Sequence, residues 1–233
     1  MKLSVIVPVY NEKNTVRAIV KRIENVNLGK IKKEIIIVDD CSTDGSIGII
    51  RNLKGDYIKL FHKKNSGKGA ALKTGIKAAT GDFIIFQDAD LEYNPQDYKK
   101  LLKPMLENKA ILVFGSRFSK KSKFIPNKQT MHPMHWIGNK GLTLTFNMIY
   151  GTNLTDVEPC YKLFKSDVLK SVDVKSDRFE YDIELMCKLV KKGYNILQLP
   201  ITYHPRAFDE GKKINWRDGI IAFLTMIKYA FQQ

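Results

Sequence analysis

Long hydrophobic runs are absent from this 233-residue chain. A membrane-spanning helix needs about 20 mostly apolar residues. The longest stretch without Asp, Glu, Lys or Arg runs from Gly141 to Thr155, and several Thr and Asn interrupt it. The N-terminus also lacks a signal peptide, because MKLSVIVPVYNE returns to polar residues after a few apolar ones. We therefore expect a cytoplasmic protein that is peripheral at the cytoplasmic face of a membrane.

Cysteine and acidic residues are also scarce. Cys41, Cys160 and Cys187 are odd in number and far apart, which fits a reducing compartment and excludes a disulfide framework. The 24 acidic residues stand against 39 Lys and Arg, so the formal net charge is +15. Such an excess favours an anionic partner: nucleic acid, a phosphorylated substrate or an acidic membrane surface. Because no nucleic-acid module is readable, we do not expect nucleic acid.

The chain alternates apolar runs with amphipathic segments. Strands are predicted at 3–10, 34–40, 57–61, 82–88, 110–116, 160–164 and 195–203, and helices at 12–26, from about 43, at 67–79, 95–108, 181–192 and 216–231. This rhythm predicts an α/β fold with an open, mostly parallel sheet flanked by helices. Ligands bind beyond the carboxyl ends of such strands. Four polar groups fall there: Tyr10 to Glu12, Asp39–Asp40, Asp88 to Asp90, and Ser116–Arg117.

The span 108–155 combines basic and apolar residues without a single acid. Its basic residues are Lys109, Arg117, Lys120, Lys121, Lys123, Lys128 and Lys140. Either these lysines are ordinary solvated residues, or the span faces a membrane or a lipid phosphate. The apolar helix at 216–231 either lies on the bilayer or packs in a core or a dimer. His132 and His135 have no visible third metal ligand, so we expect a surface or substrate-side role for them.

Three acids alternate in GDFIIFQDADLEYNP (81–95), where a buried strand ends. In an extended segment Asp88, Asp90 and Glu92 point the same way, and they repel one another unless a cation lies between them. Oxygen ligands without His or Cys favour Mg²⁺ or Mn²⁺. The alternative is a solvated turn before a helix, for which Asn94 is the predicted N-cap and Pro95 the first residue.

Two further turns follow predicted strands. The acids at 39–45 either cap the next helix or bind a base or ribose. Gly67, Lys68 and Gly69 open a helix, so its free N–H groups are expected to face an anion. The spacing is not that of a P-loop.

Eight segments in this order resemble family 2 glycosyltransferases. They are VPVYNE (7–12), VDDCSTDG (38–45), NSGKGAA (65–71), GDFIIFQDADLEYNP (81–95), GSR (115–117), TDVEPCYKLF (155–164), RFEYDIEL (178–185) and PRAFDEGKKINWRDG (205–219). The resemblance covers nearly the whole chain and is to the branch that contains dolichol-phosphate mannose synthases and bacterial polyprenyl-phosphate sugar synthases. It implies a GT-A fold and an inverting, metal-dependent transfer of a hexose. The implied donor is of the GDP-mannose or UDP-glucose type, and the implied acceptor is a polyprenyl or dolichyl phosphate.

The resemblance also implies roles for individual residues. Donor binding is implied for Pro8, Tyr10, Asn11, Glu12, Val38, Asp39, Asp40, Lys68, Asp88, Ala89, Asp90, Arg206, Lys212 and Lys213. Metal binding is implied for Asp88 and Asp90, with Glu92 as a further ligand. Arg117 and Asp90 are expected to act at the reacting phosphates.

The acceptor decides whether a general base is needed. A lipid phosphate is ionised near pH 7, whereas a glycan hydroxyl needs a base, for which the resemblance implies Asp182 or Glu184. Their alternative role is a helix-terminal charge or an ion pair. We expect residues 1–204 to form the transferase domain, with 108–155 as its acceptor-facing part. Residues 205–233 are expected to be a lid, which brings Arg206 or Lys212 to the diphosphate, and a C-terminal helix. A homodimer or a membrane partner protein is compatible with the sequence.

Overall fold

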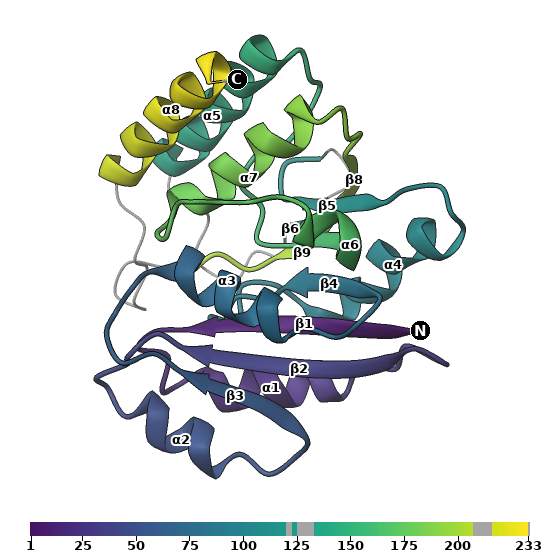
Figure 1. Cartoon of the computed structure of the whole chain (residues 1–233), viewed down its shortest axis with the longest axis vertical. Coiled ribbons are helices and arrows are strands. Elements are labelled where there is room, and N and C mark those ends of the chain that lie inside the picture. Colours follow the sequence, from purple (N-terminus) through teal and green to yellow (C-terminus); the bar gives the residue numbers. More distant parts are fainter. Residues whose placement is uncertain (120–122, 125–132, 207–215, 233) are drawn as a thin grey trace.

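The computed structural model describes residues 1–119, 123–124, 133–206 and 216–232 (Figure 1). Its main sheet contains the strands β1 (Lys2–Val9), β2 (Lys32–Asp39), β3 (Tyr57–Phe61), β4 (Phe83–Phe86), β5 (Leu112–Ser116), β7 (Lys162–Lys165) and β8 (Leu197–Pro200). They lie in the order β3-β2-β1-β4-β7-β5-β8, and β7 alone among these strands is antiparallel to its neighbours. The predicted open, mostly parallel sheet is confirmed.

Helices cover both faces of this sheet (Figure 1). They are α1 (Val16–Glu24), α2 (Ser46–Asn52), α3 (Lys68–Ala78), the 3₁₀ turn η1 (Pro95–Asp97), α4 (Tyr98–Leu106), α5 (Pro133–Tyr150), α6 (Ser166–Lys170), α7 (Glu180–Lys191) and α8 (Trp216–Phe231). Successive strand residues point to opposite faces. Val5 and Val7 therefore pack in a core with α1 and α4, while Ile6 packs in a second core with α3 and α7. Because the central strands contribute side chains to both cores, they are apolar throughout.

The N-terminal half follows the prediction closely. Residues Val16, Ile19, Val20 and Ile23 form the buried face of α1. Asn94 precedes η1 as predicted, and its Oδ1 accepts the N–H of Gln96 at 3.1 Å. The first helix begins at Val16 rather than at residue 12, because residues 10–15 form a loop that turns back toward residues 42–46.

Three elements differ from the prediction. Helices α5 and α6 were not expected, and α5 contains Gly138, Gly141 and several β-branched or polar residues with low helix propensity. Phe146 of α5 is buried and the helix packs against α8, and these contacts compensate for its low helix propensity. The strand expected at 195–203 is divided at Ile201 into β8 and β9 (Thr202–Tyr203), and β9 pairs with β6 (Lys123–Phe124) in a separate small sheet.

The helices α5 and α8 lie side by side at one end of the molecule, next to α7 (Figure 1). Both helices are rich in apolar residues on their outer surfaces as well as at their contact. None of the helices in the described part of the chain is long and apolar enough to cross a membrane.

Candidate active site

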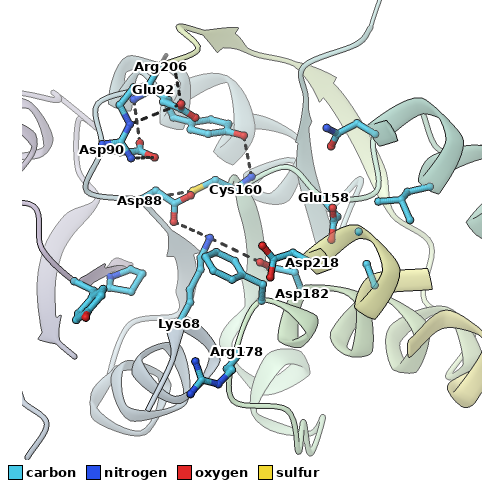
Figure 2. A pocket seen from close by; sticks show the side chains of 18 of the residues that line it. Lys68, Asp88, Asp90, Glu92, Glu158, Cys160, Arg178, Asp182, Arg206 and Asp218 are labelled. Atoms are coloured by element: carbon cyan, nitrogen blue, oxygen red, sulfur yellow. Dashed lines mark hydrogen bonds and ion pairs between the residues drawn. The ribbon is translucent and has the colours of Figure 1, made fainter. Parts of the chain in front are cut away.

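A cavity of about 1000 Å³ lies beyond the carboxyl ends of β1 and β4, between α3, α7, α5 and α8. The predicted site residues that line it are Pro8, Tyr10, Glu12, Asp40, Lys68, Asp88, Ala89, Asp90, Glu92, Arg117, Asp182 and Arg206. Figure 2 shows Asp90 beside Arg206 at one side and Glu158, Asp182 and Asp218 at the other. The strands therefore bring residues far apart in the sequence to one place, as the α/β pattern predicted.

Four predicted residues do not line the cavity. Val38 and Glu184 are fully buried elsewhere, and Asn11 and Asp39 shape loops. Asn11 has a left-handed backbone (φ 51°), and its Oδ1 accepts the N–H of Thr43. The N–H of Ser42 donates to Asp39 Oδ1. This geometry does not support direct donor contacts by these side chains. Lys212, Lys213 and His132 lie outside the described residues, as do the lid residues 207–215 and the basic residues Lys120, Lys121 and Lys128.

Lys68 and Asp88 form the centre of the site. Lys68 Nζ lies 2.8 Å from Asp88 Oδ1, and the N–H of Asp88 donates to Cys160 Sγ. Burial acts to raise the pKa of Asp88, but the Lys68 ammonium outweighs it and lowers that pKa below its ordinary value. Asp88 is therefore a carboxylate held in its ionised form by the Lys68 ammonium.

The carboxylate of Asp182 lies against two lysines. Lys162 Nζ, which is fully buried, lies 2.6 Å from Asp182 Oδ1, and Lys68 Nζ lies 3.8 Å from Oδ2. These contacts use both oxygens of the predicted general base.

Arg206 contacts three acids that line the cavity. Its guanidinium lies 3.2 Å from both Glu12 Oε2 and Asp90 Oδ2, and the backbone N–H of Arg206 donates to Glu92 Oε1 at 2.8 Å. Burial, followed by the charges of Glu92 and Asp88, raises the pKa of Asp90 to about 8. Asp90 therefore lies where a cation is needed to keep it ionised at neutral pH.

Metal binding by Asp88, Asp90 and Glu92 stays a prediction, and the geometry favours two of these three carboxylates. No three His, Cys, Asp or Glu side chains of the described residues lie together as metal ligands do. The segment is not extended after Asp88, because Leu91 has a φ of 66° and turns the chain. Glu92 instead accepts the backbone N–H of Arg206 and the hydroxyl of Tyr203 at 3.1 Å. It therefore fixes the segment that follows β9, although it lines the same cavity as Asp88 and Asp90.

The start of α3 is also less open than predicted. Asp40 accepts the N–H groups of Ser66 and Gly67 at 2.9 and 2.7 Å, together with Nδ1 of His62 at 2.7 Å. The N–H of Ala70 donates to the carbonyl of Asp177. These N–H groups are therefore engaged within the protein, and the cation that this turn presents to the cavity is Lys68.

Arg117 lines the cavity but is paired. Its Nε and Nη2 each lie 2.8 Å from an oxygen of Asp156, and Nη2 also donates to Asn139 Oδ1 at 2.9 Å. Despite burial, the charge of Asp156 holds the pKa of Arg117 well above its ordinary value. Much of its charge is balanced inside the protein, which weakens the predicted contact with substrate phosphate. Asp156 was not predicted, although it is the first acid after the acid-free span.

Glu184 has a structural environment. Its side chain is fully buried and accepts the N–H groups of Lys175 and Ser176, both at 2.8 Å, while Lys188 lies 2.5 Å from Oε1. Burial opposes ionisation, but these hydrogen bonds lower the pKa of Glu184 to about 2. This environment does not favour the predicted role of Glu184 as a general base, because the carboxylate faces the loop before α7 and does not line the cavity.

Three charged residues in the cavity lining were missed in the sequence: Glu158, Arg178 and Asp218. All three lie inside segments that carry the family resemblance, so their position was a usable signal. Burial and the charge of Asp182 raise the pKa of Glu158 to about 7, although Lys162 and Arg117 act in the opposite direction.

The sequence matches the family model described as Glycosyl transferase family 2 over residues 4–173. The chain belongs to this family. Among similar proteins is a UDP-N-acetylglucosamine–dolichyl-phosphate N-acetylglucosaminyltransferase of Methanococcus voltae, which is 28% identical over 84% of this chain and 83% of its own length. The hexosyltransferase Agl6 of low-salt glycan biosynthesis in Haloferax volcanii is 30% identical over 88% of this chain and 48% of its own. The predicted family is confirmed, and the chain is a glycosyltransferase.

Solved structures of other proteins have the same fold as this chain. Glucosyl-3-phosphoglycerate synthase of Mycobacterium tuberculosis, in complex with Mn²⁺, uridine diphosphate and phosphoglyceric acid, matches with a TM-score of 0.74 and 18% identity. The match covers 100% of this chain and 79% of that chain. The predicted GT-A fold is therefore confirmed.

Proposed function

We propose that this glycosyltransferase moves a hexose, with inversion, from a nucleotide-sugar to a polyprenyl or dolichyl phosphate at a membrane surface. The observation that carries the proposal is the contrast between the two sides of the cavity. One side has the charged residues at the strand ends, and the other is formed by α5 and α8. Large apolar side chains are exposed on these two helices: Trp136, Ile137, Leu144, Met148, Ile220, Ile221, Phe223, Leu224, Ile227 and Phe231.

Such an apolar surface beside a charged cavity suits an acceptor with a phosphate and a hydrocarbon chain. Exposed apolar patches of this kind mark lipid or protein contacts. Phe223 and Ile220 both line the cavity and are exposed, so the apolar surface continues from the cavity outward. The Methanococcus voltae relative is named as a dolichyl-phosphate N-acetylglucosaminyltransferase, which supports the same acceptor class.

The donor is proposed to bind over Pro8, Tyr10 and Asp40, with its diphosphate near Asp88 and Asp90. The donor set fits Mg²⁺ or Mn²⁺, because these ions take one or two protein carboxylates and complete their shell with water and substrate phosphates. Asp88 and Asp90 would hold the ion, which supplies positive charge for the departing diphosphate. The Mn²⁺ and uridine diphosphate in the Mycobacterium tuberculosis structure support this assignment.

The protein's own cations complete the donor site. Lys68, Arg206 and Arg178 line the cavity on the donor side or beside α3. Arg206 is proposed to leave Asp90 and Glu12 for the diphosphate as the donor binds, since one cation then replaces another at Asp90. These cations then lie beside the diphosphate before the transfer step and stabilise the charge that develops on it.

The paired state of Asp182 favours a phosphate over a hydroxyl as nucleophile. An acceptor phosphate is ionised near neutral pH, with a second pKa of about 6, and attacks the anomeric carbon without a base. A hydroxyl must lose its proton to a base. Asp182 is engaged by Lys68 and Lys162, and Glu184 faces away from the cavity.

The test is sugar transfer from a panel of radiolabelled nucleotide-sugars with Mn²⁺. The acceptors are a short-chain polyprenyl phosphate, the matching polyprenol, and a soluble oligosaccharide. The proposal predicts label in extracted lipid with the phosphate alone. Transfer to the oligosaccharide, or no transfer with any donor that binds, would contradict it.

A further inference from the structure

Glu158 differs from the other carboxylates that line the cavity. Asp88, Asp90, Glu12 and Glu92 each lie against Lys68 or Arg206, and Asp182 lies against two lysines. The Glu158 carboxylate, by contrast, forms no hydrogen bond or ion pair with any residue in the described part of the chain. It faces the side of the cavity where α8 begins (Figure 2).

In the described part of the chain, the two cations that act on Glu158 are already paired with other acids. Lys162 on β7 is engaged with Asp182 on α7, and Arg117 after β5 is engaged with Asp156 on the same loop as Glu158. Asp218 on α8 lines the same cavity and adds another acid. An incoming phosphate dianion would therefore meet an unpaired carboxylate, and two anions at hydrogen-bond distance do not both stay ionised.

We propose that Glu158 is a catalytic residue that binds the acceptor in its protonated form, by donating a hydrogen bond from its carboxyl O–H to a non-bridging oxygen of the acceptor phosphate. This inference rests on the proposed lipid-phosphate acceptor. A charge-assisted bond of this kind is short and strong, and it orients the phosphate. Burial beside Asp182 gives Glu158 a pKa of about 7, so the proton is available at neutral pH.

No proton moves in the transfer step. An unprotonated oxygen of the acceptor phosphate forms the new bond to the anomeric carbon. The bond from that carbon to the diphosphate breaks, and its electron pair leaves with the diphosphate. Glu158 keeps its proton throughout, which distinguishes it from a general base for a hydroxyl acceptor.

The test is Glu158→Gln, because an amide is a permanent hydrogen-bond donor of nearly the same shape. The measurement is kcat/KM for polyprenyl phosphate from pH 6 to pH 9, at saturating donor and Mn²⁺, since this ratio reports ionisations in the free enzyme. The wild-type ratio should fall about tenfold between pH 7 and pH 8.5 as Glu158 ionises. The Gln variant should retain at least about a third of the wild-type value at pH 7 and lose less than about twofold over the same range.

Other variants keep the result interpretable. Glu158→Ala should raise KM for the phosphate acceptor at every pH, because it removes the donor. Glu107→Gln, on the exposed surface, should behave like the wild type. Both Glu158 variants should unfold at or above the wild-type temperature, since Glu158 has no partner to lose among the described residues.

Two outcomes would overturn the inference. If Glu158→Gln abolishes kcat while acceptor binding persists, Glu158 accepts a proton. If it follows the wild-type pH profile, Glu158 does not contact the acceptor phosphate. Transfer to polyprenyl phosphate by the wild type is measured in the same series, so failure of the acceptor class is seen separately.

Discussion

The ammonium of Lys68 lies between two carboxylates, 2.8 Å from Asp88 Oδ1 and 3.8 Å from Asp182 Oδ2. It thereby joins the start of α3 to the end of β4 and to α7. Asp88 belongs to the proposed donor side and Asp182 to the proposed acceptor side of the same cavity. One lysine thus holds both halves of the site together and is the natural first target for mutation.

Replacing Lys68 by Met should destabilise the protein by about 3 kcal/mol, because it leaves two largely buried carboxylates facing each other. The measurement is chemical unfolding at pH 7. Lys73→Met, on the same helix, is the matched control: its partner Asp177 is exposed, so the loss should stay below about 1 kcal/mol. Equal losses in the two variants would show that Lys68 has no special electrostatic role.

Replacing Arg206 by Met should raise the affinity for Mn²⁺ in the absence of nucleotide by about tenfold, because the variant lacks the cation that occupies Asp90. Titration followed by electron paramagnetic resonance of free Mn²⁺ measures this. Arg178→Met removes another cavity cation that lies outside this acidic group, and it should change the affinity much less. A weaker affinity in Arg206→Met would mean that Arg206 orders the carboxylates and does not compete with the ion.

Replacing Glu184 by Gln should lower stability at pH 7 by about 2 kcal/mol and leave the activity of the folded protein intact. The folded-state pKa of Glu184, about 2, lies below that of the unfolded chain. Its stabilisation is therefore full above about pH 4.5, decreases as the pH falls, and is lost below about pH 2. The stability difference between variant and wild type should disappear over this window.

Glu180→Gln, at the start of the same helix, is the control for Glu184 and should change stability little. Loss of kcat in Glu184→Gln at unchanged stability would contradict the structural role and restore Glu184 as a candidate base.

Replacing Met148 and Leu224 by Glu should weaken binding to lipid vesicles and raise KM for polyprenyl phosphate by about tenfold or more, because both side chains are exposed on the α5 and α8 surfaces. Neither lines the cavity, so nucleotide-sugar binding should not change. Leu106→Glu, an exposed apolar residue on α4, is the control. If all variants co-sediment equally with vesicles, the outer surfaces of α5 and α8 do not bind the membrane.

The features predicted correctly from the sequence are those that depend on short-range patterns along the chain. The apolar runs of β1 and β2 predict strands buried on both faces, and Asn94–Pro95 predicts the start of η1. The acids and cations at strand ends converge because parallel strands end at one edge of the sheet. These features depend on chain periodicity and on short-range hydrogen bonds, which a sequence displays directly.

The remaining features depend on tertiary contacts. The left-handed backbone of Leu91 ends the extended run after Asp88, and no residue type at that position announces the turn. Helix α5 is stable through its packing with α8 and not through its own propensity. The pairing of Arg117 with Asp156, and of Asp182 with Lys162, also joins residues that lie 20 or more positions apart. Motif reading placed Arg117 and Asp182 in the site but could not show that Asp156 and Lys162 already balance their charges.

The most direct test of the proposed function is the chemical identity of the product. Wild-type protein, Mn²⁺, the nucleotide-sugar that binds, and a short-chain polyprenyl phosphate are incubated, and the lipid fraction is studied by mass spectrometry and ³¹P NMR. The account predicts one hexose added per lipid and conversion of the phosphomonoester resonance into that of a phosphodiester. A product in which the hexose is joined to a hydroxyl, with the lipid phosphomonoester unchanged, would contradict it.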